Sequence, residues 1–205
     1  MGWYDENILP HVLNYACSIK PVRKQREKIV PLASGDVLEI GMGSGLNLPY
    51  YDSSKVRKIW GLEPSEAMRK VARKKHAETD LELEFIDLPG EQIPLETSSV
   101  DTVLVTYTLC TIPDVMLALE GMRRVLKPGG RLLFCEHGRA PDDSVSRWQN
   151  RLNPGWRRLA GGCNLNRDIP QLIRSAGFRI DVDERMYVPG PRVLSYNYWG
   201  SATLA

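Results

Sequence analysis

The sequence predicts an α/β fold, with a doubly wound sheet of seven strands and helices on both faces. Most strands are expected to be parallel and the last one antiparallel. Three observations predict this fold. Apolar strand-like segments alternate with helical segments along most of the chain, which is typical of a parallel sheet. A glycine-rich turn directly follows the first strand, and the chain closes with two extended segments joined by the Pro-Gly-Pro turn at 189–191.

The elements follow one another in a regular order. Strands are expected at 37–40, 57–63, 81–87, 100–106, 131–136, 178–188 and 193–203. Helices are expected at 65–76, 113–126 and 168–176, with a short one at 46–51. The Lys-Pro-Gly-Gly sequence at 127–130 is a stop signal for the helix before it.

Length and composition indicate one globular domain over residues 1–205. Of the 205 residues, 42% are hydrophobic and 25% are charged, which suits a soluble protein with a substantial core. The formal net charge of +2 gives no reason to expect nucleic acid as a partner. No apolar stretch is long enough to span a membrane and no secretory signal is visible, so a cytoplasmic location is expected.

The cysteines give no sign of a metal site. Cys17, Cys110, Cys135 and Cys163 are widely separated, and the chain contains no C-x-x-C pair. Closely spaced cysteines are the usual sequence sign of zinc, so no metal is predicted. Cys110 and Cys135 stand in apolar strand-like segments, where buried free thiols in a reducing compartment are expected.

Residues 1–33 precede the first strand and are expected to form a helical lid or cap. Apolar residues recur at helical spacing from Ile8 to Ala16, and Pro21 suits the first turn of a second helix. The second helix carries a basic run, which favours a solvated face. A membrane-surface patch is the alternative, because Trp3, Tyr4 and Tyr15 lie just upstream. The basic residues are Lys20, Arg23, Lys24, Arg26 and Lys28.

The glycine-rich turn is the candidate ligand site. Gly41, Gly43 and Gly45 follow the first strand, and glycine lets a ligand lie against bare backbone. Open α/β sheets bind ligands at the carboxyl ends of their strands. Glu63 closes the second strand, where such folds place an acid that accepts hydrogen bonds from a ribose diol.

The spacing of the glycines excludes the usual dinucleotide pattern. That pattern, G-x-G-x-x-G, needs a glycine at position 46, where this chain has Leu46. The observed form is Glu-x-Gly-x-Gly-x-Gly, beginning at Glu39. In the short helix expected at 46–51, Ser44 and Asn47 would cap backbone donors beside an anionic group of the ligand.

The ordered set of motifs resembles the class I S-adenosylmethionine-dependent methyltransferases, in the branch that includes the ubiquinone/menaquinone C-methyltransferases. The set comprises the glycine turn, Glu63, Val100-Asp101 with its strand, and Arg-Val-Leu-Lys-Pro-Gly-Gly at 124–130. The resemblance implies a Rossmann-like fold, S-adenosylmethionine as cofactor, S-adenosylhomocysteine as product, and a small-molecule methyl acceptor.

The resemblance also implies where the cofactor lies. The Gly90 and Glu91 backbone is expected at the adenine, because Pro89 replaces the acidic residue that many relatives place there. The methionine carboxylate is expected beside Ser44 and Asn47. The full set of expected cofactor-binding residues is Glu39, Gly41, Gly43, Ser44, Gly45, Asn47, Glu63, Pro64, Gly90, Glu91 and Thr106.

Shorter segments resemble the thiol S-methyltransferases of animals, which implies a thiol acceptor. Those relatives carry an N-terminal membrane anchor, and no such segment is visible here. The matching segments are Leu109-Cys110, Glu136-His137, Trp148-Gln149, Pro154-x-Trp156 and Gly162-Cys163-Asn164-Leu165-x-Arg167.

Residues 138–168 break the alternation of strands and helices and are predicted to form a cap over the acceptor. Long insertions in compact domains are usually functional. We expect Trp148, Trp156, Cys163 and Asn164 to contact the acceptor. The alternative is an extra helix that shields an edge of the sheet.

Methyl transfer from a sulfonium needs proximity and orientation more than acid–base catalysis. A thiol is partly ionised at neutral pH, whereas an amine or phenol acceptor needs a base more. His137, at the end of the fifth strand, is the candidate base, and Tyr107 is expected to border the methyl group. Each residue also has a structural alternative: His137 could simply be hydrogen-bonded at the end of a strand, and Tyr107 could simply pack.

Other functions stay open at this point. A lipid amine or a quinol or phenol is the second acceptor class, and a non-catalytic S-adenosylmethionine-binding module is a further alternative. A nicotinamide-dependent oxidoreductase is disfavoured by Leu46 and by the absence of an evident Tyr-x-x-x-Lys motif.

Overall fold

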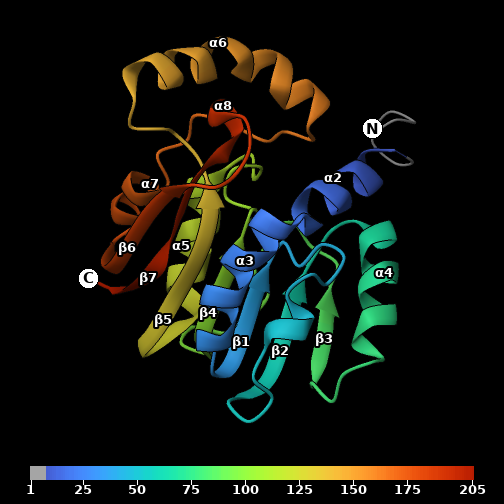
Figure 1. Cartoon of the computed structure of the whole chain (residues 1–205). Helices are drawn as coiled ribbons and strands as arrows, with labels where there is room; N and C mark the ends of the chain where they lie inside the picture. The colour runs from blue at the N-terminus through green and yellow to red at the C-terminus, as the bar shows by residue number, and fades with distance from the viewer. Residues whose placement is uncertain (1–7) are drawn as a thin grey trace.

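The computed structural model contains the predicted seven-stranded sheet (Figure 1). It describes residues 8–205, except for the side chain of Pro10, so the predicted roles of Trp3 and Tyr4 lie outside the described residues. The strands are β1 (Gly35–Ile40), β2 (Val56–Leu62), β3 (Leu83–Ile86), β4 (Val100–Thr106), β5 (Leu126–His137), β6 (Phe178–Tyr187) and β7 (Tyr196–Leu204). They are arranged in the order β3-β2-β1-β4-β5-β7-β6.

The predicted antiparallel last strand is confirmed. β7 runs antiparallel to both of its neighbours, β5 and β6, whereas the pairs among β1 to β5 are parallel. The helices are α2 (Leu9–Ser18), α3 (Lys20–Ile29), η1 (Val30–Leu32), η2 (Leu48–Tyr50), α4 (Glu66–His76), α5 (Val115–Val125), α6 (Asp143–Leu159), α7 (Ile169–Ser175) and α8 (Arg192–Ser195).

Alternate residues of the central strands bury opposite faces of the sheet. Val103 and Val105 of β4 join the apolar cluster that contains α5 and α7. Leu104, between them, joins the cluster formed by Ile29 and Val30 at the end of α3. Because side chains alternate along a strand, a strand with a continuous apolar run needs cover on both sides, and the helices provide it (Figure 1).

The fifth strand begins earlier than its predicted start at residue 131. α5 ends at Val125, and Leu126 already pairs with Val100 of β4. The register shifts after Leu126 and resumes where Arg131 pairs with Thr102. The Lys-Pro-Gly-Gly sequence therefore stops the helix as predicted, but it is absorbed into an irregular start of β5.

The short helix predicted at 46–51 is reduced to the three-residue η2. The predicted capping roles of Ser44 and Asn47 are wrong, because their side chains bond elsewhere. The Ser44 hydroxyl donates to Asn14 of α2, and Asn47 Nδ2 donates to the buried Glu39 carboxylate at 2.9 Å. A buried carboxylate needs hydrogen-bond donors and here takes the side chain that would otherwise cap the turn.

Two helical regions lie over the carboxyl edge of the sheet (Figure 1). α2 lies above this edge and α6 crosses above the ends of β5 and β7, whereas α3 lies against one face of the sheet. Pro21 lies in the first turn of α3, as predicted. Within residues 8–205, no helix has both the length and the apolar character required to cross a bilayer.

Candidate active site

A cavity of about 550 Å³ lies at the carboxyl ends of β1, β2, β4 and β5. α2 and α3 form one wall of it, and the loop after α6 forms another. The predicted site residues that line it are Gly41, Gly43, Ser44, Glu63, Pro64, Gly90, Glu91, Thr106, Tyr107, His137, Trp156 and Cys163.

The Glu63 carboxylate is hydrogen-bonded to the backbone of the glycine turn. Glu63 Oε2 accepts a hydrogen bond from the Gly43 amide at 2.9 Å, and Oε1 accepts one from the Ser65 amide at 2.8 Å. Gly43 has φ +58°, and a Cβ atom there would point into open space, with its nearest neighbour 3.9 Å away. The turn therefore presents bare backbone beside a carboxylate.

Gly41 brings two loops into close contact. Its φ is +66°, and an added Cβ would lie 2.3 Å from the Thr108 side chain in the loop after β4. Only glycine permits this approach. The loops after β1 and β4 can therefore form adjoining walls of one cavity.

A buried polar network lies behind the glycine turn. Glu39 is 1% exposed and accepts hydrogen bonds from Tyr51 Oη at 2.6 Å and from Asn47 Nδ2. Arg26 of α3 donates to Asn47 Oδ1 at 2.7 Å and to Thr106 Oγ1 at 2.6 Å. Glu39, Gly45 and Asn47 thus support the turn from behind and do not line the cavity.

Arg26 lines the cavity, whereas the basic run of its helix predicted a solvated face. It is 5% exposed, and its Nε has no hydrogen-bond partner among the described residues. Helical spacing gave a usable signal, because Arg26 falls on the same face of α3 as Val22 and Ile29. A buried cation that reaches a cavity is suited to an anionic group of a ligand.

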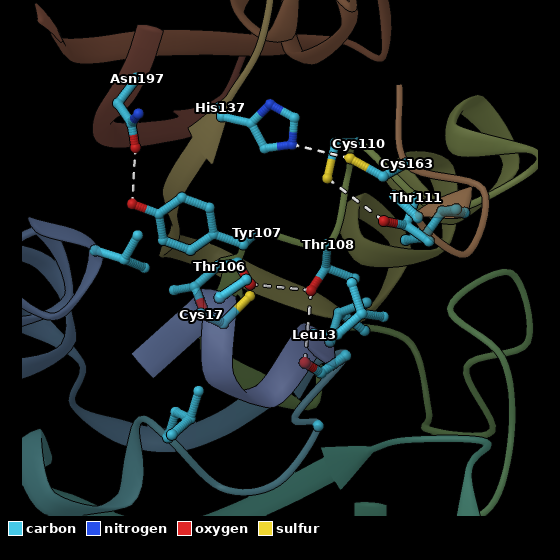
Figure 2. A pocket seen from close by; sticks show the side chains of 18 of the residues that line it. Leu13, Cys17, Thr106, Tyr107, Thr108, Cys110, Thr111, His137, Cys163 and Asn197 are labelled. Carbon is cyan, nitrogen blue, oxygen red and sulfur yellow. Dashed lines mark hydrogen bonds between the residues drawn. The ribbon is translucent and has the colours of Figure 1, made fainter. Parts of the chain in front are cut away.

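The far end of the cavity contains His137 and two cysteines (Figure 2). His137 Nε2 lies 3.1 Å from Cys163 Sγ, and Cys110 lies beside them in the loop after β4. Burial opposes protonation of His137, but the neighbouring Cys163 and Glu136 outweigh it and raise the pKa of the imidazole. Its Nε2 is therefore directed at a thiol.

Tyr107 points its hydroxyl away from these groups. Tyr107 Oη donates to Asn197 Oδ1 of β7 at 2.7 Å, while the ring lines the cavity (Figure 2). Burial raises the pKa of Tyr107 well above its ordinary value, so the phenol stays neutral. The residue has φ +54°, an uncommon conformation outside glycine, which indicates that the turn after β4 is held in place by its surroundings.

The structure brings two of the four predicted acceptor contacts to the cavity. Trp156 and Cys163 line it, and Trp156 Nε1 is buried without a partner among residues 8–205. Trp148 is 54% exposed on the outer side of α6 and does not line the cavity. Asn164 is buried behind the wall, where its Nδ2 donates to the Cys110 carbonyl at 2.9 Å.

Comparisons with known proteins place the chain in a family. The family model for the methyltransferase domain matches residues 38–134. The thiol S-methyltransferase TMT1B of Homo sapiens is 34% identical over 174 residues, which cover 79% of this chain and 70% of that protein. The chain belongs to the class I S-adenosylmethionine-dependent methyltransferases. The methyl donor of this family is S-adenosylmethionine.

Two further comparisons agree with this assignment. The thiol S-methyltransferase TMT1B of Rattus norvegicus is 36% identical over 146 residues, 69% of this chain, and the match spans 59% of that protein. An S-adenosylmethionine-dependent methyltransferase structure from Thermotoga maritima has a TM-score of 0.67 at 22% identity, covering 97% of this chain and 96% of that chain. The likeness to the Thermotoga maritima structure shows that the two chains have the same fold.

The cavity fits S-adenosylmethionine at three points. The Glu63 carboxylate lines the cavity and has the acceptor oxygens that the expected ribose diol requires, and the bare Gly43 backbone leaves room beside it. Arg26 lines the cavity, and its buried guanidinium, with Nε unpaired among the described residues, is suited to the expected methionine carboxylate. Gly90 and Glu91, where the adenine is expected, also line the cavity.

The stability of this methyltransferase is expected to fall as pH rises through about 7, because of Glu39. Burial raises the pKa of Glu39 to about 7 from an ordinary value of 4.5. The folded state therefore binds more protons than the unfolded state between these pH values, and ionisation destabilises it by about 3 kcal/mol. In Glu39→Gln this fall should be absent.

Urea unfolding at pH 5.5 and pH 8.5 measures the effect. The difference in unfolding free energy between wild type and Glu39→Gln isolates the one carboxyl, because other titrating groups contribute equally to both. Glu66→Gln, at an exposed helix position, should follow the wild type. Parallel pH profiles for wild type and Glu39→Gln would contradict the buried-carboxyl argument.

Proposed function

We propose that this methyltransferase transfers the methyl group of S-adenosylmethionine to the sulfur of a small-molecule thiol. Its similarity to two thiol S-methyltransferases, at 34% and 36% identity, supports this acceptor class. The observation that carries the proposal is the composition of the acceptor end of the cavity. It combines the His137 imidazole and two thiols with apolar walls, and the only carboxylates that line the cavity among residues 8–205 are Glu63 and Glu91.

The ionisable groups of the cavity are unevenly placed. Its carboxylates, within the described residues, are Glu63 and Glu91, and both belong to the cofactor end. Val188, Pro189 and Leu194 also line the cavity and provide apolar surface, in the segment that leads to Asn197, the β7 residue paired with His137. An amine acceptor, protonated at neutral pH, would need a group that takes its proton, whereas a thiol ionises more readily. The arrangement therefore favours a small apolar thiol.

The transfer itself is a displacement at carbon. The acceptor thiolate attacks the methyl carbon, and a new sulfur–carbon bond forms as the sulfonium–carbon bond breaks. The electron pair of the broken bond stays on the cofactor sulfur, which gives neutral S-adenosylhomocysteine and a thioether. The contribution of the protein is to hold the two sulfur atoms in line with the methyl group.

An acceptor screen tests the proposal. The purified protein is incubated with S-adenosylmethionine and, in separate reactions, 2-mercaptoethanol, benzenethiol, histamine, phenol and phosphatidylethanolamine vesicles, and products are identified by mass spectrometry. We expect methyl thioethers from the thiols, above the level in reactions without protein. Methylated amine, phenol or lipid without any thioether would overturn the thiol assignment and leave the family unchanged.

A further inference from the structure

We infer that Cys110, His137 and Cys163 bind a zinc ion in the wall of the active-site cavity, and that this ion holds the acceptor thiol as a thiolate. The metal site rests on the three side chains alone. Its role with the acceptor rests on the proposed thiol methylation. Figure 2 shows the three side chains converging at one end of the cavity.

The spacing of the three ligand atoms suits a tetrahedral zinc. The His137 nitrogen and the Cys110 and Cys163 sulfurs all lie within 4.8 Å of one another, and His137 Nε2 is 3.1 Å from Cys163 Sγ. Zinc bonds of roughly 2.3 Å to sulfur and 2.1 Å to nitrogen put tetrahedral ligands about 3.5 to 3.8 Å apart. Small side-chain rotations would therefore close the site around the ion.

The ligand set is one that zinc prefers, and it is incomplete. Two thiolates and an imidazole are soft and borderline donors, which select zinc over magnesium or calcium. Catalytic zinc sites use three protein ligands and keep a fourth position for water or substrate. Here the fourth position would face the cavity, since all three residues line it.

Hydrogen bonds fix the loops that carry the ligands. The amide and Nδ2 of Asn164 donate to the Cys110 carbonyl at 2.8 and 2.9 Å, which ties the loop of Cys163 to that of Cys110. Glu136, next to His137, accepts from the Thr108 and Leu109 amides at 2.7 and 3.0 Å. The three backbones are therefore joined before an ion binds, so little ordering cost remains.

Spacing along the chain hides this cluster. Its members are 26 or more residues apart, and the absence of C-x-x-C pairs predicted no metal. Each ligand nevertheless stands in one of the short segments that resemble the animal thiol S-methyltransferases: Leu109-Cys110, Glu136-His137 and Gly162-Cys163. The residues that carry the narrow resemblance are thus the ones that converge in space.

Zinc would change how the acceptor is activated. A thiol that binds zinc loses its proton to solvent, and the resulting thiolate stays nucleophilic while bound. It attacks the methyl carbon of S-adenosylmethionine, and the electron pair of the sulfonium–carbon bond remains on the cofactor sulfur. The neutral thioether product is a weaker ligand and leaves. His137 is then a ligand, in place of its predicted role as a base.

Metal binding is tested first without any methyl transfer. The protein is stripped with EDTA, dialysed, and titrated with Zn²⁺ and with Co²⁺. We expect one ion per chain by elemental analysis, and for Co²⁺ the visible bands of a tetrahedral site together with thiolate charge transfer. Metal below one-half equivalent, or an octahedral Co²⁺ spectrum without charge transfer, would overturn the inference.

Variants assign the ion to the cluster. Cys110→Ser and Cys163→Ser should weaken Co²⁺ binding by more than about 100-fold, since loss of an outer-shell partner alone costs up to that much. Cys17→Ser, whose thiol lines the cavity outside the cluster, should keep the full spectrum. Binding of S-adenosylhomocysteine shows that each variant is folded. An unchanged Co²⁺ spectrum in both serine variants of the cluster would overturn the site.

The role of the ion is separable from the proposed reaction. Addition of 2-mercaptoethanol to the Co²⁺ protein should alter the charge-transfer bands, as a thiolate enters the fourth position. That change without any methylated thiol would support the site and overturn the proposed function. Full thiol methylation by stripped protein in EDTA would overturn the inferred role of zinc in holding the acceptor thiolate and support the proposed function.

Discussion

Glu63→Gln is expected to bind S-adenosylhomocysteine about 100-fold more weakly than the wild type. A hydrogen bond to a charged acceptor contributes roughly 1.5–3 kcal/mol, and the ribose diol is expected to donate two of them. A loss of about 3 kcal/mol corresponds to two orders of magnitude in Kd. Isothermal titration calorimetry measures the change directly.

The controls for Glu63 address folding and charge. The carboxylate also accepts from the Gly43 and Ser65 amides, and Gln keeps one acceptor oxygen, so the turn should persist. Thermal unfolding without ligand should confirm a folded variant. Glu66→Gln removes a nearby exposed carboxylate and should bind like the wild type. A Kd for Glu63→Gln within threefold of the wild type would remove the ribose assignment.

Arg26→Met is expected to weaken binding of S-adenosylhomocysteine by about 100-fold while leaving 5′-methylthioadenosine nearly unaffected. The two ligands share the adenosine and the sulfur, but only S-adenosylhomocysteine has the amino acid carboxylate. A charge-assisted pair in a buried site contributes roughly 2–3 kcal/mol, so its loss should appear with one ligand alone. Glu63→Gln, by contrast, should weaken both ligands.

A matched control lies on the same helix. Arg23 of α3 is exposed and is 3.9 Å from Glu27, so Arg23→Met should bind both ligands normally. Met at position 26 keeps much of the side-chain volume, which limits collapse of the buried network with Asn47 and Thr106. Equal weakening of both ligands would show that Arg26 acts through the fold of the turn and not through the carboxylate.

Local patterns predicted the sheet because each strand carries its own signal. β4 was expected at 100–106 and occupies Val100–Thr106, since it contains the apolar run Val103 to Val105 and both of its faces are buried. Ser65, expected to open the helix after the second strand, caps α4 by accepting a hydrogen bond from the Met68 amide at 3.4 Å. Such features depend on neighbours within a few positions.

The site was harder to predict because its contacts are distant in the chain. Asn47 was predicted to cap a helix, but both polar atoms of its side-chain amide are hydrogen-bonded elsewhere. Its Nδ2 donates to the buried Glu39, and its Oδ1 accepts from Arg26 of α3. Trp148 and Trp156 share one helix, and only the orientation of α6 decides that Trp156 reaches the cavity. Sequence spacing identified these residues as candidates. It could not predict which of them line the cavity, which are buried behind it and which are exposed to solvent.

The position of β7 has a consequence for how the protein is made. β1 to β5 can pair in order as they leave a ribosome. Within residues 8–205, however, β6 has only β7 as a sheet neighbour, and β7 comes after it in the chain. β7 also carries Asn197, which accepts the Tyr107 hydroxyl at the cavity wall. A nascent chain thus holds an unpaired edge of β5 and an unfinished cavity until its final strand inserts, a period in which aggregation competes with folding.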